Sequence, residues 1–183
     1  MQNIIYTNRL ILKVLDSSSS SMLLDFVREG KEDFEPFETL KDFRFYTKDF
    51  QKNLLNYEYS LICNNKYARY YIFLKEAPHR IIGTVSFGFF TEFPFSSCNI
   101  GYKFLKKYHG HGYAKEACIY AINEIFQSLR FHQIFAYIMP SNTSSINLAL
   151  SLGFQNEGLF KKCLCIRGIW EDHYVYKLLN PFE

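Results

Sequence analysis

The sequence predicts a single mixed α/β domain, and three observations support this. The chain has 183 residues, a length typical of one domain. Apolar residues make up 48% and charged residues 21%, the balance of a soluble globular protein rather than a disordered one. The apolar pattern also changes repeatedly between the two-residue alternation of strands and the three- or four-residue spacing of helices.

In the first third of the chain, residues 9–15 alternate as a strand does. The serines at 17–21 precede an apolar-periodic stretch that ends at Gly30, so they indicate the start of a helix rather than a linker. Residues 31–46 mix acids with aromatic rings, which predicts a loop or a broken helix. A second helix is expected from about residue 47 to 63.

Strands dominate the middle of the chain. Residues 70–74 and 81–90 are β-rich runs whose spacing predicts a hairpin, and residues 98–105 form a third run. The clearest helix then begins at Ala114, where apolar residues recur every three or four positions over about four turns. These apolar positions are Ala114, Ala117, Cys118, Ala121, Ile122, Ile125, Phe126 and Leu129.

A strand at 134–139 and a short helix follow. Asn142 or Ser144 is expected to cap that helix, and Gly153 to end it. A final β region passes through Phe160 and then residues 172–179.

Charge and cysteine usage exclude several classes of protein. Lysines and arginines exceed acids by only 21 − 18 = 3, too few for a general nucleic-acid binder. No apolar run reaches the ~20 residues that span a membrane, and the N-terminal segment lacks the pattern of a signal peptide. The cysteines form no CxxC pair, which predicts reduced thiols and a cytoplasmic protein. They are Cys63, Cys98, Cys118, Cys163 and Cys165.

The segment between the third β-run and the long helix is rich in glycine and lysine, and reads KKYHGHGYA from Lys106 to Ala114. A turn of this kind presents unpaired backbone N–H groups at the positive end of a helix dipole, and its glycines let an anion approach closely. The pattern therefore predicts a pyrophosphate site. Its spacing is neither GxGxxG nor GxxxxGK[ST], which argues against Rossmann and P-loop sites. The histidine pair at 109 and 111 supplies too few ligands for zinc, so no metal is expected.

Two motifs in this order resemble the GNAT superfamily of acyl-CoA-dependent N-acetyltransferases, most of all its Rim-type ribosomal-protein (alanine) members. The family's phosphate-loop pattern, [QR]-x-x-G-x-[GA], falls on His109, Gly112 and Ala114. The later pattern, N-x-x-S followed by L-G-F-x-x-E-G, begins at Asn142 and ends at Gly158. The resemblance covers about residues 7–180, expected to form a single acetyltransferase domain.

The resemblance implies a central, mixed, mostly antiparallel sheet that is splayed at the coenzyme A site and flanked by about four helices. Backbone amides from His111 to Ala114 are expected to hold the pyrophosphate of acetyl-CoA, the co-substrate. Asn142 is expected to bind the pantetheine, and Ser145 is the expected catalytic residue, protonating or stabilising the departing thiolate. The expected cofactor-binding residues are Phe104, Leu105, Lys107, His109, Gly110, His111, Gly112, Tyr113, Ala114, Asn142 and Ser145.

The chain departs from the family's pattern at two positions. His109 replaces the usual glutamine or arginine, which main-chain phosphate binding tolerates. Asn99 stands where relatives often carry an acidic base, and Glu92 is a fallback for that role. Deprotonating a lysine amine at neutral pH costs about 4–5 kcal/mol, whereas an α-amino group costs about 1–1.5 kcal/mol. A site without a strong base therefore favours the α-amine of a protein N-terminus, of the ribosomal-protein type, as acceptor.

Two alternatives stay open at this point. The acceptor can instead be a small amine, such as an antibiotic or a polyamine, since residues 20–50 and 90–97, which build the acceptor side, have little signature. The aromatic residues from Phe34 to Tyr46 can line that pocket or pack as a satellite core. A non-catalytic acyl-CoA-binding module is the second alternative. Many relatives dimerise, so a homodimer is compatible with the resemblance.

Overall fold

The computed structural model describes residues 1–183 and builds them around one eight-stranded sheet with the order β1-β2-β3-β4-β5-β6-β8-β7. The strands are β1 (Ile4–Tyr6), β2 (Leu10–Lys13), β3 (Ala68–Leu74), β4 (Ala77–Thr91), β5 (Ser97–Phe104), β6 (Gln133–Ile138), β7 (Gln155–Ile166) and β8 (Ile169–Leu179). The α-helices are α1 (Ser20–Glu29), α2 (Lys31–Phe34), α3 (Lys48–Cys63), α4 (Tyr113–Leu129) and α5 (Thr143–Ser151). Short 3₁₀ turns are η1 (Ser17–Ser19), η2 (Glu35–Phe37), η3 (Phe43–Tyr46) and η4 (Lys106–Tyr108). None of the helices is long and apolar enough to cross a membrane.

The predicted sheet is confirmed as mixed and mostly antiparallel, because β5 and β6 are its only parallel pair. About four helices were expected and five are present. The additional helix, α2, has four residues and lies in the segment predicted as a broken helix. The sequence did not indicate β1, whose three residues are too few to show an alternation.

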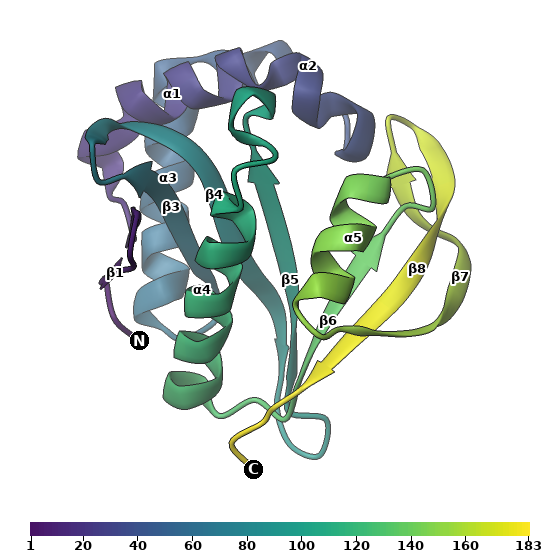
Figure 1. Ribbon diagram of the computed structural model, residues 1–183. Helices are drawn as coiled ribbons and strands as arrows, with labels where there is room; N and C mark the ends of the chain where they lie inside the picture. The colour runs from purple at the N-terminus through teal and green to yellow at the C-terminus, as the bar shows by residue number, and fades with distance from the viewer.

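Helices cover both faces of the sheet. In Figure 1, α4 and α5 lie in front of the strands, while α3 lies behind them and α1 and α2 cross above. Successive side chains of a strand point to opposite faces, and β5 shows this clearly. Its residues Cys98, Ile100 and Phe104 pack in the core beneath α4 and α5. A second, smaller apolar cluster fills the space between α1, α3 and the opposite face.

The sheet opens between β5 and β6. Their pairing is limited to three positions, where Ser97, Cys98 and Asn99 lie beside residues 133–135. Beyond these positions β5 continues to Phe104 and β6 to Ile138 without pairing, although both strands keep their other neighbours. This gap is the splay expected in the sheet.

Glu116, in the first turn of α4, ties that helix to the N-terminal strands. Its Oε1 atom accepts hydrogen bonds from Thr7 Oγ1 (2.6 Å) and Arg9 N (2.9 Å), and its Oε2 atom accepts one from Arg9 Nε (2.7 Å). Arg9 also donates to the carbonyl oxygen of His111, at 2.9 Å. Glu116 therefore supports the glycine-rich turn that leads into α4, a structural role.

We expect Glu116→Ala to lower the free energy of unfolding by about 1–3 kcal/mol at neutral pH, since it leaves Thr7 and Arg9 without their acceptor. Burial raises the pKa of Glu116, but the hydrogen bonds from Thr7 and Arg9 outweigh it and hold the pKa below its ordinary value of 4.5. A carboxyl group whose pKa is lower in the folded state stabilises the fold at pH values above its unfolded-state pKa. This contribution is lost as the pH falls through its folded-state pKa.

Urea unfolding at several pH values tests this prediction. The difference between wild type and Glu116→Ala should be full at neutral pH and shrink in acid below 4.5. Glu157→Ala is a suitable control, because it removes only an exposed ion pair with Lys177 and should cost less than about 1 kcal/mol. An equal difference at pH 3 and pH 7 would contradict the prediction.

Candidate active site

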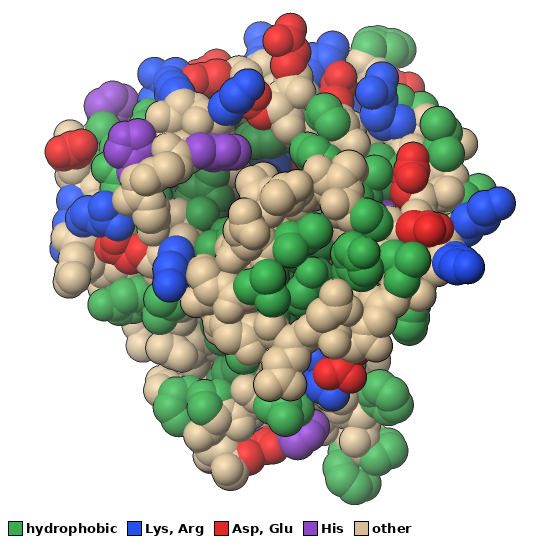
Figure 2. Space-filling model, turned by 45° about the vertical axis from the view of Figure 1, so that its right-hand side comes forward, with side chains coloured by type: hydrophobic (Ala, Val, Ile, Leu, Met, Phe, Trp, Pro, Cys, Tyr) green, Lys and Arg blue, Asp and Glu red, His purple; other side chains and the backbone are tan.

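A cavity of about 600 Å³ passes through the opening between β5 and β6. From β5 it is lined by Tyr102 and Phe104, which face α4 and α5, and by Gly101 and Lys103, which face the other side. Because neighbouring residues of a strand point to opposite faces, a cavity that touches both sets must reach both sides of the sheet. In Figure 2 its mouth is the hollow beside the histidine side chains in the upper left.

The edge of β5 that faces the opening carries free backbone groups. Leu105 N donates to the Ile82 carbonyl on the β4 side, at 3.0 Å. Backbone direction alternates along a strand, so Lys103 also points its groups to β4, while Tyr102 and Phe104 point theirs to the opening. The carbonyl of Phe104 accepts a bond from His109 Nε2 (2.9 Å). The N–H groups of Tyr102 and Phe104 thus face the cavity.

The glycine-rich turn forms one end of the cavity. Gly110 and Gly112 have φ values of +78° and +76°, a left-handed conformation that glycine adopts without strain. The first backbone bond of α4 runs from Glu116 N to Gly112 O, so the N–H groups of Tyr113 and Ala114 have no partner within the helix. Both residues line the cavity, as does His109. This end of the cavity is therefore suited to an anion.

Three residues expected at the cofactor site lie outside the cavity. The Lys107 side chain points to α1, where its Nζ atom lies 2.6 Å from Glu29 Oε1. Leu105 uses its N–H for β4 and packs its side chain in the smaller apolar cluster. His111 is exposed, and its ring stacks on Tyr113 at a centroid distance of 5.6 Å.

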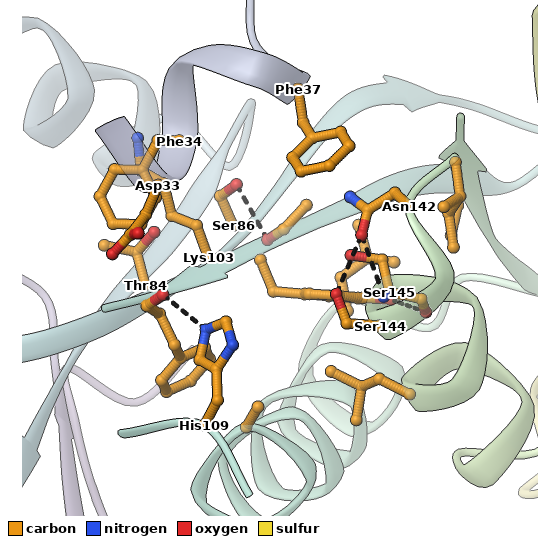
Figure 3. A pocket seen from close by; sticks show the side chains of 18 of the residues that line it. Asp33, Phe34, Phe37, Thr84, Ser86, Lys103, His109, Asn142, Ser144 and Ser145 are labelled. Carbon is orange, nitrogen blue, oxygen red and sulfur yellow. Dashed lines mark hydrogen bonds between the residues drawn. The ribbon is translucent and has the colours of Figure 1, made fainter. Parts of the chain in front are cut away.

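The start of α5 forms the opposite wall. Asn142 caps this helix, as predicted: its Oδ1 atom accepts bonds from Ser145 N (3.2 Å) and Ser144 Oγ (3.1 Å). Figure 3 shows Asn142, Ser144 and Ser145 across the cavity from Lys103 and His109. The hydroxyl of Tyr102 donates to the Ser145 carbonyl at 2.9 Å and so fixes the distance between β5 and α5. Burial raises the pKa of Tyr102 and keeps that hydroxyl protonated.

On the far side of the sheet the cavity is polar. Arg69 Nη1 lies 2.7 Å from Glu58 Oε1, and the hydroxyl of Tyr71 donates to the other Glu58 oxygen at 2.8 Å. Lys103 Nζ lies 2.7 Å from Glu38 Oε1. Burial is the main cause that lowers the pKa of Lys103, although Glu38 opposes it. Two cations, each held by one carboxylate, therefore form part of the wall.

The aromatic residues from α2 to η3 were considered both as pocket lining and as a satellite core, and different residues serve each role. Phe34 and Phe37 line the cavity, whereas Phe45 and Tyr46 pack against the smaller core cluster. Residues 90–97, also expected on the acceptor side, contribute nothing to the lining.

Neither residue considered for the base position reaches the cavity. Asn99 lies where β5 and β6 are still paired, and Glu92 lies in the loop between β4 and β5. Cys118 lies on the buried face of α4, and its complete burial raises the pKa of its thiol. It does not line the cavity, in line with a packing role. No group of three or more His, Cys, Asp or Glu side chains is arranged to hold a metal ion.

Sequence reasoning did not single out several residues of the wall, among them Arg69, Tyr102, Lys103 and His173. Lys103 and Tyr102 could have been found by following the alternation of β5 toward the glycine-rich turn. Arg69 and His173 carry no local signal, because only the pairing of distant strands brings them to the cavity.

Comparisons with known proteins agree with this geometry. The model of the acetyltransferase (GNAT) domain family matches residues 25–155. Probable N-acetyltransferase YjcK of Bacillus subtilis is 31% identical over 171 residues, covering 93% of this chain and 92% of the relative.

Two solved structures are also similar. The ribosomal-protein-S5-alanine acetyltransferase of Vibrio fischeri superposes with a TM-score of 0.92 at 28% identity, covering 98% of both chains. RimJ of Mycobacterium smegmatis, in complex with CoA-disulfide, has a TM-score of 0.86 at 21% identity, covering 93% of this chain and 81% of that one. At that identity, the second likeness supports the fold alone.

Gly112, at the anion end of the cavity, has a left-handed backbone conformation that a residue with a Cβ atom adopts only with strain. Gly112→Ala forces φ near +76° on a residue with a Cβ atom, which should cost about 1 kcal/mol and shift the N–H groups at the start of α4. We expect binding of inorganic pyrophosphate, measured by calorimetry, to weaken at least tenfold.

Gly168→Ala is the matched control, because Gly168 has φ +83° in the β7–β8 turn and does not line the cavity. Both variants should lose similar stability in thermal melts, but only Gly112→Ala should lose pyrophosphate affinity. Equal affinity in both variants would remove the turn from the anion site.

Proposed function

The chain belongs to the GNAT acetyltransferase family, and we propose that it acetylates the α-amine at the N-terminus of a protein, of the ribosomal-protein type. Residues 7–180 form the transferase domain in this proposal. The observation that carries it is the cavity through the sheet, with an anion site on one side. On the other side is the acceptor chamber, whose wall includes Arg69 and Lys103 with their carboxylate partners.

The residues on the α4 and α5 side fit acetyl-CoA. The free N–H groups of Tyr113 and Ala114 suit a pyrophosphate, since a helix N-terminus favours negative charge. The open edge of β5 suits an extended, amide-bearing chain such as pantetheine, which can pair with it as a strand would. The Nδ2 group of Asn142, not used in capping α5, can donate to the same chain.

This arrangement suits direct transfer of the acetyl group from acetyl-CoA to the amine. The N–H groups of Tyr102 and Phe104 are the donors placed to stabilise the oxyanion that forms when the amine attacks the thioester carbonyl. Leu105 N is not available for this role, because it is bonded to β4. Ser145 lies on the cavity wall with its hydroxyl free of any protein partner, and we assign it the stabilisation of the departing thiolate. Holding both reactants in one channel also removes the entropic cost of their encounter.

The acceptor chamber suits the α-amine of a protein N-terminus. Arg69 and Lys103 are partly exposed in it, each beside its carboxylate partner, so their N–H groups are hydrogen-bond donors for a ligand. A protein N-terminus brings a single amine with a carbonyl group next to it, and a carbonyl oxygen accepts hydrogen bonds from a guanidinium group.

An acceptor panel tests the proposal. The initial rate of thiol release from acetyl-CoA should be high with an alanine- or serine-starting peptide. An Nα-blocked peptide with a free lysine should react about two to three orders of magnitude more slowly, the difference in neutral amine between the two groups. Spermidine and kanamycin should be poor acceptors. Faster turnover of lysine, spermidine or kanamycin would contradict the assignment, and binding of CoA without any turnover would favour a binding module.

Ser145→Ala tests the role of the hydroxyl. We expect kcat to fall about 10²-fold, the usual range for a lost proton-transfer group, while the affinity for CoA stays within a few-fold. Ser151→Ala is the control on the same helix, since the Ser151 hydroxyl bonds only the Leu148 carbonyl and lies outside the cavity. An unchanged kcat in Ser145→Ala would mean that another donor stabilises the departing thiolate.

A further inference from the structure

The acceptor ammonium must lose a proton before it can attack, and most acids and histidines of the cavity are already engaged. Asp33 accepts a bond from the Lys106 amide at 3.1 Å. Glu38 is paired with Lys103 at 2.7 Å and lies 3.7 Å from the Lys41 ammonium. His109 is bonded to Phe104 at the anion end, across the sheet from the acceptor chamber.

His173 is the remaining candidate, and its ring has a defined orientation. The side chain is only 3% exposed, yet it lines the cavity. Its Nδ1 atom lies 3.1 Å from the carbonyl oxygen of Glu171. A carbonyl can only accept, so Nδ1 carries the proton and donates it. In the neutral ring the lone pair therefore resides on Nε2, which hydrogen-bonds no protein group.

The strand pairing places His173 beside the opening of the sheet. Its neighbour on β8, Tyr174, lies opposite Ile138, the last residue of β6. Tyr174 and Tyr176 pack against the core under α5, so the alternation of β8 turns His173 to the other face. That face carries Arg69 and Lys103, and it is the face from which the acceptor amine approaches.

Charged groups near this chamber come from several elements. Arg69 lies on β3, Lys103 on β5, and Asp33 and Glu38 on α2 and the segment that follows η2. Tyr137 faces the chamber from β6, and β7 places the uncharged Phe160 opposite the histidine. On β8, Glu171 lies two residues before His173, and Asp172 directly precedes it and accepts a bond from Lys162 N at 2.8 Å. None of these side chains hydrogen-bonds Nε2. The imidazole is therefore not committed to a carboxylate or a hydroxyl and is free to accept a proton from a ligand.

We propose that His173 is the general base that deprotonates the acceptor amine, directly or through one water molecule, an inference that rests on the proposed function. Nε2 takes one proton from the ammonium, and the neutral amine attacks the thioester carbonyl carbon. The C–N bond forms and the C–S bond breaks. The proton that the new amide nitrogen sheds goes to the sulfur by way of Ser145, and the imidazolium releases its own proton to solvent. One amide, one thiol and one proton result.

The pH dependence of His173→Gln tests this proposal, because glutamine keeps polarity and similar size but cannot act as a base. At neutral pH we expect kcat/KM for an alanine-starting peptide to fall about 10²-fold. At about pH 9.5 the α-amine is already neutral, so the variant should recover to within a few-fold of wild type. The affinity for CoA, measured by calorimetry, should be unchanged. His132→Gln, at an exposed site outside the cavity, is the control and should behave as wild type at every pH.

The outcomes separate this inference from the proposed function. A variant that equals wild type at neutral pH, or one with the same deficit at all pH values, overturns the role of His173 and leaves peptide acetylation standing. A wild-type enzyme that uses no peptide but acetylates another amine overturns the proposed acceptor. The same pH series on that amine then decides the role of His173. If His173→Gln does not fold, His173→Asn provides the second variant, with the same expected recovery at high pH.

Discussion

The separation of β5 from β6 is the constraint on which the rest of the site depends. Two parallel strands that pair for three residues and then diverge leave backbone donors and acceptors without a sheet partner. Buried groups of this kind must find other partners, and His109 Nε2 supplies one by bonding the Phe104 carbonyl. The Tyr102 hydroxyl spans the gap to the Ser145 carbonyl of α5. The remaining N–H groups of β5 are what a strand-like ligand can use.

Both ends of the proposed co-substrate site are positioned by the same gap. β5 leads through η4 into the turn of Gly110 and Gly112, and β6 leads into the Asn142 cap of α5. The two helix N-termini thereby lie on the same side of the sheet, one at each wall of the cavity. The proposed acceptor chamber lies on the opposite side, because alternate residues of β5 and β6 point there. A reaction between two large substrates can then proceed with each approaching from its own face.

Local patterns were enough to predict the elements and the parts of the site that lie within one segment. The glycine-rich turn, the periodicity of α4 and the Asn142 cap are all encoded by neighbouring residues, and each is present in the structure. Contacts between distant segments were beyond that reasoning. Lys107 was expected at the phosphates, but Glu29 of α1 draws it to the other side. Leu105 was expected among the cofactor-binding residues, but its hydrogen bond to the Ile82 carbonyl directs its N–H to β4. Arg69, Lys103 and His173 come together only through the order of the strands.

The most direct test of transfer through the opened sheet is a crystal structure with a bisubstrate conjugate, in which CoA is joined through its sulfur to the N-terminus of an alanine-starting peptide. The pantetheine should lie along the open edge of β5 on the α4 and α5 side. The linking atom should lie in the gap near Tyr102, and the peptide should emerge beside Arg69, Lys103 and His173. A peptide that leaves the cavity on the α5 side, or a pantetheine that does not contact β5, would contradict transfer through the opened sheet.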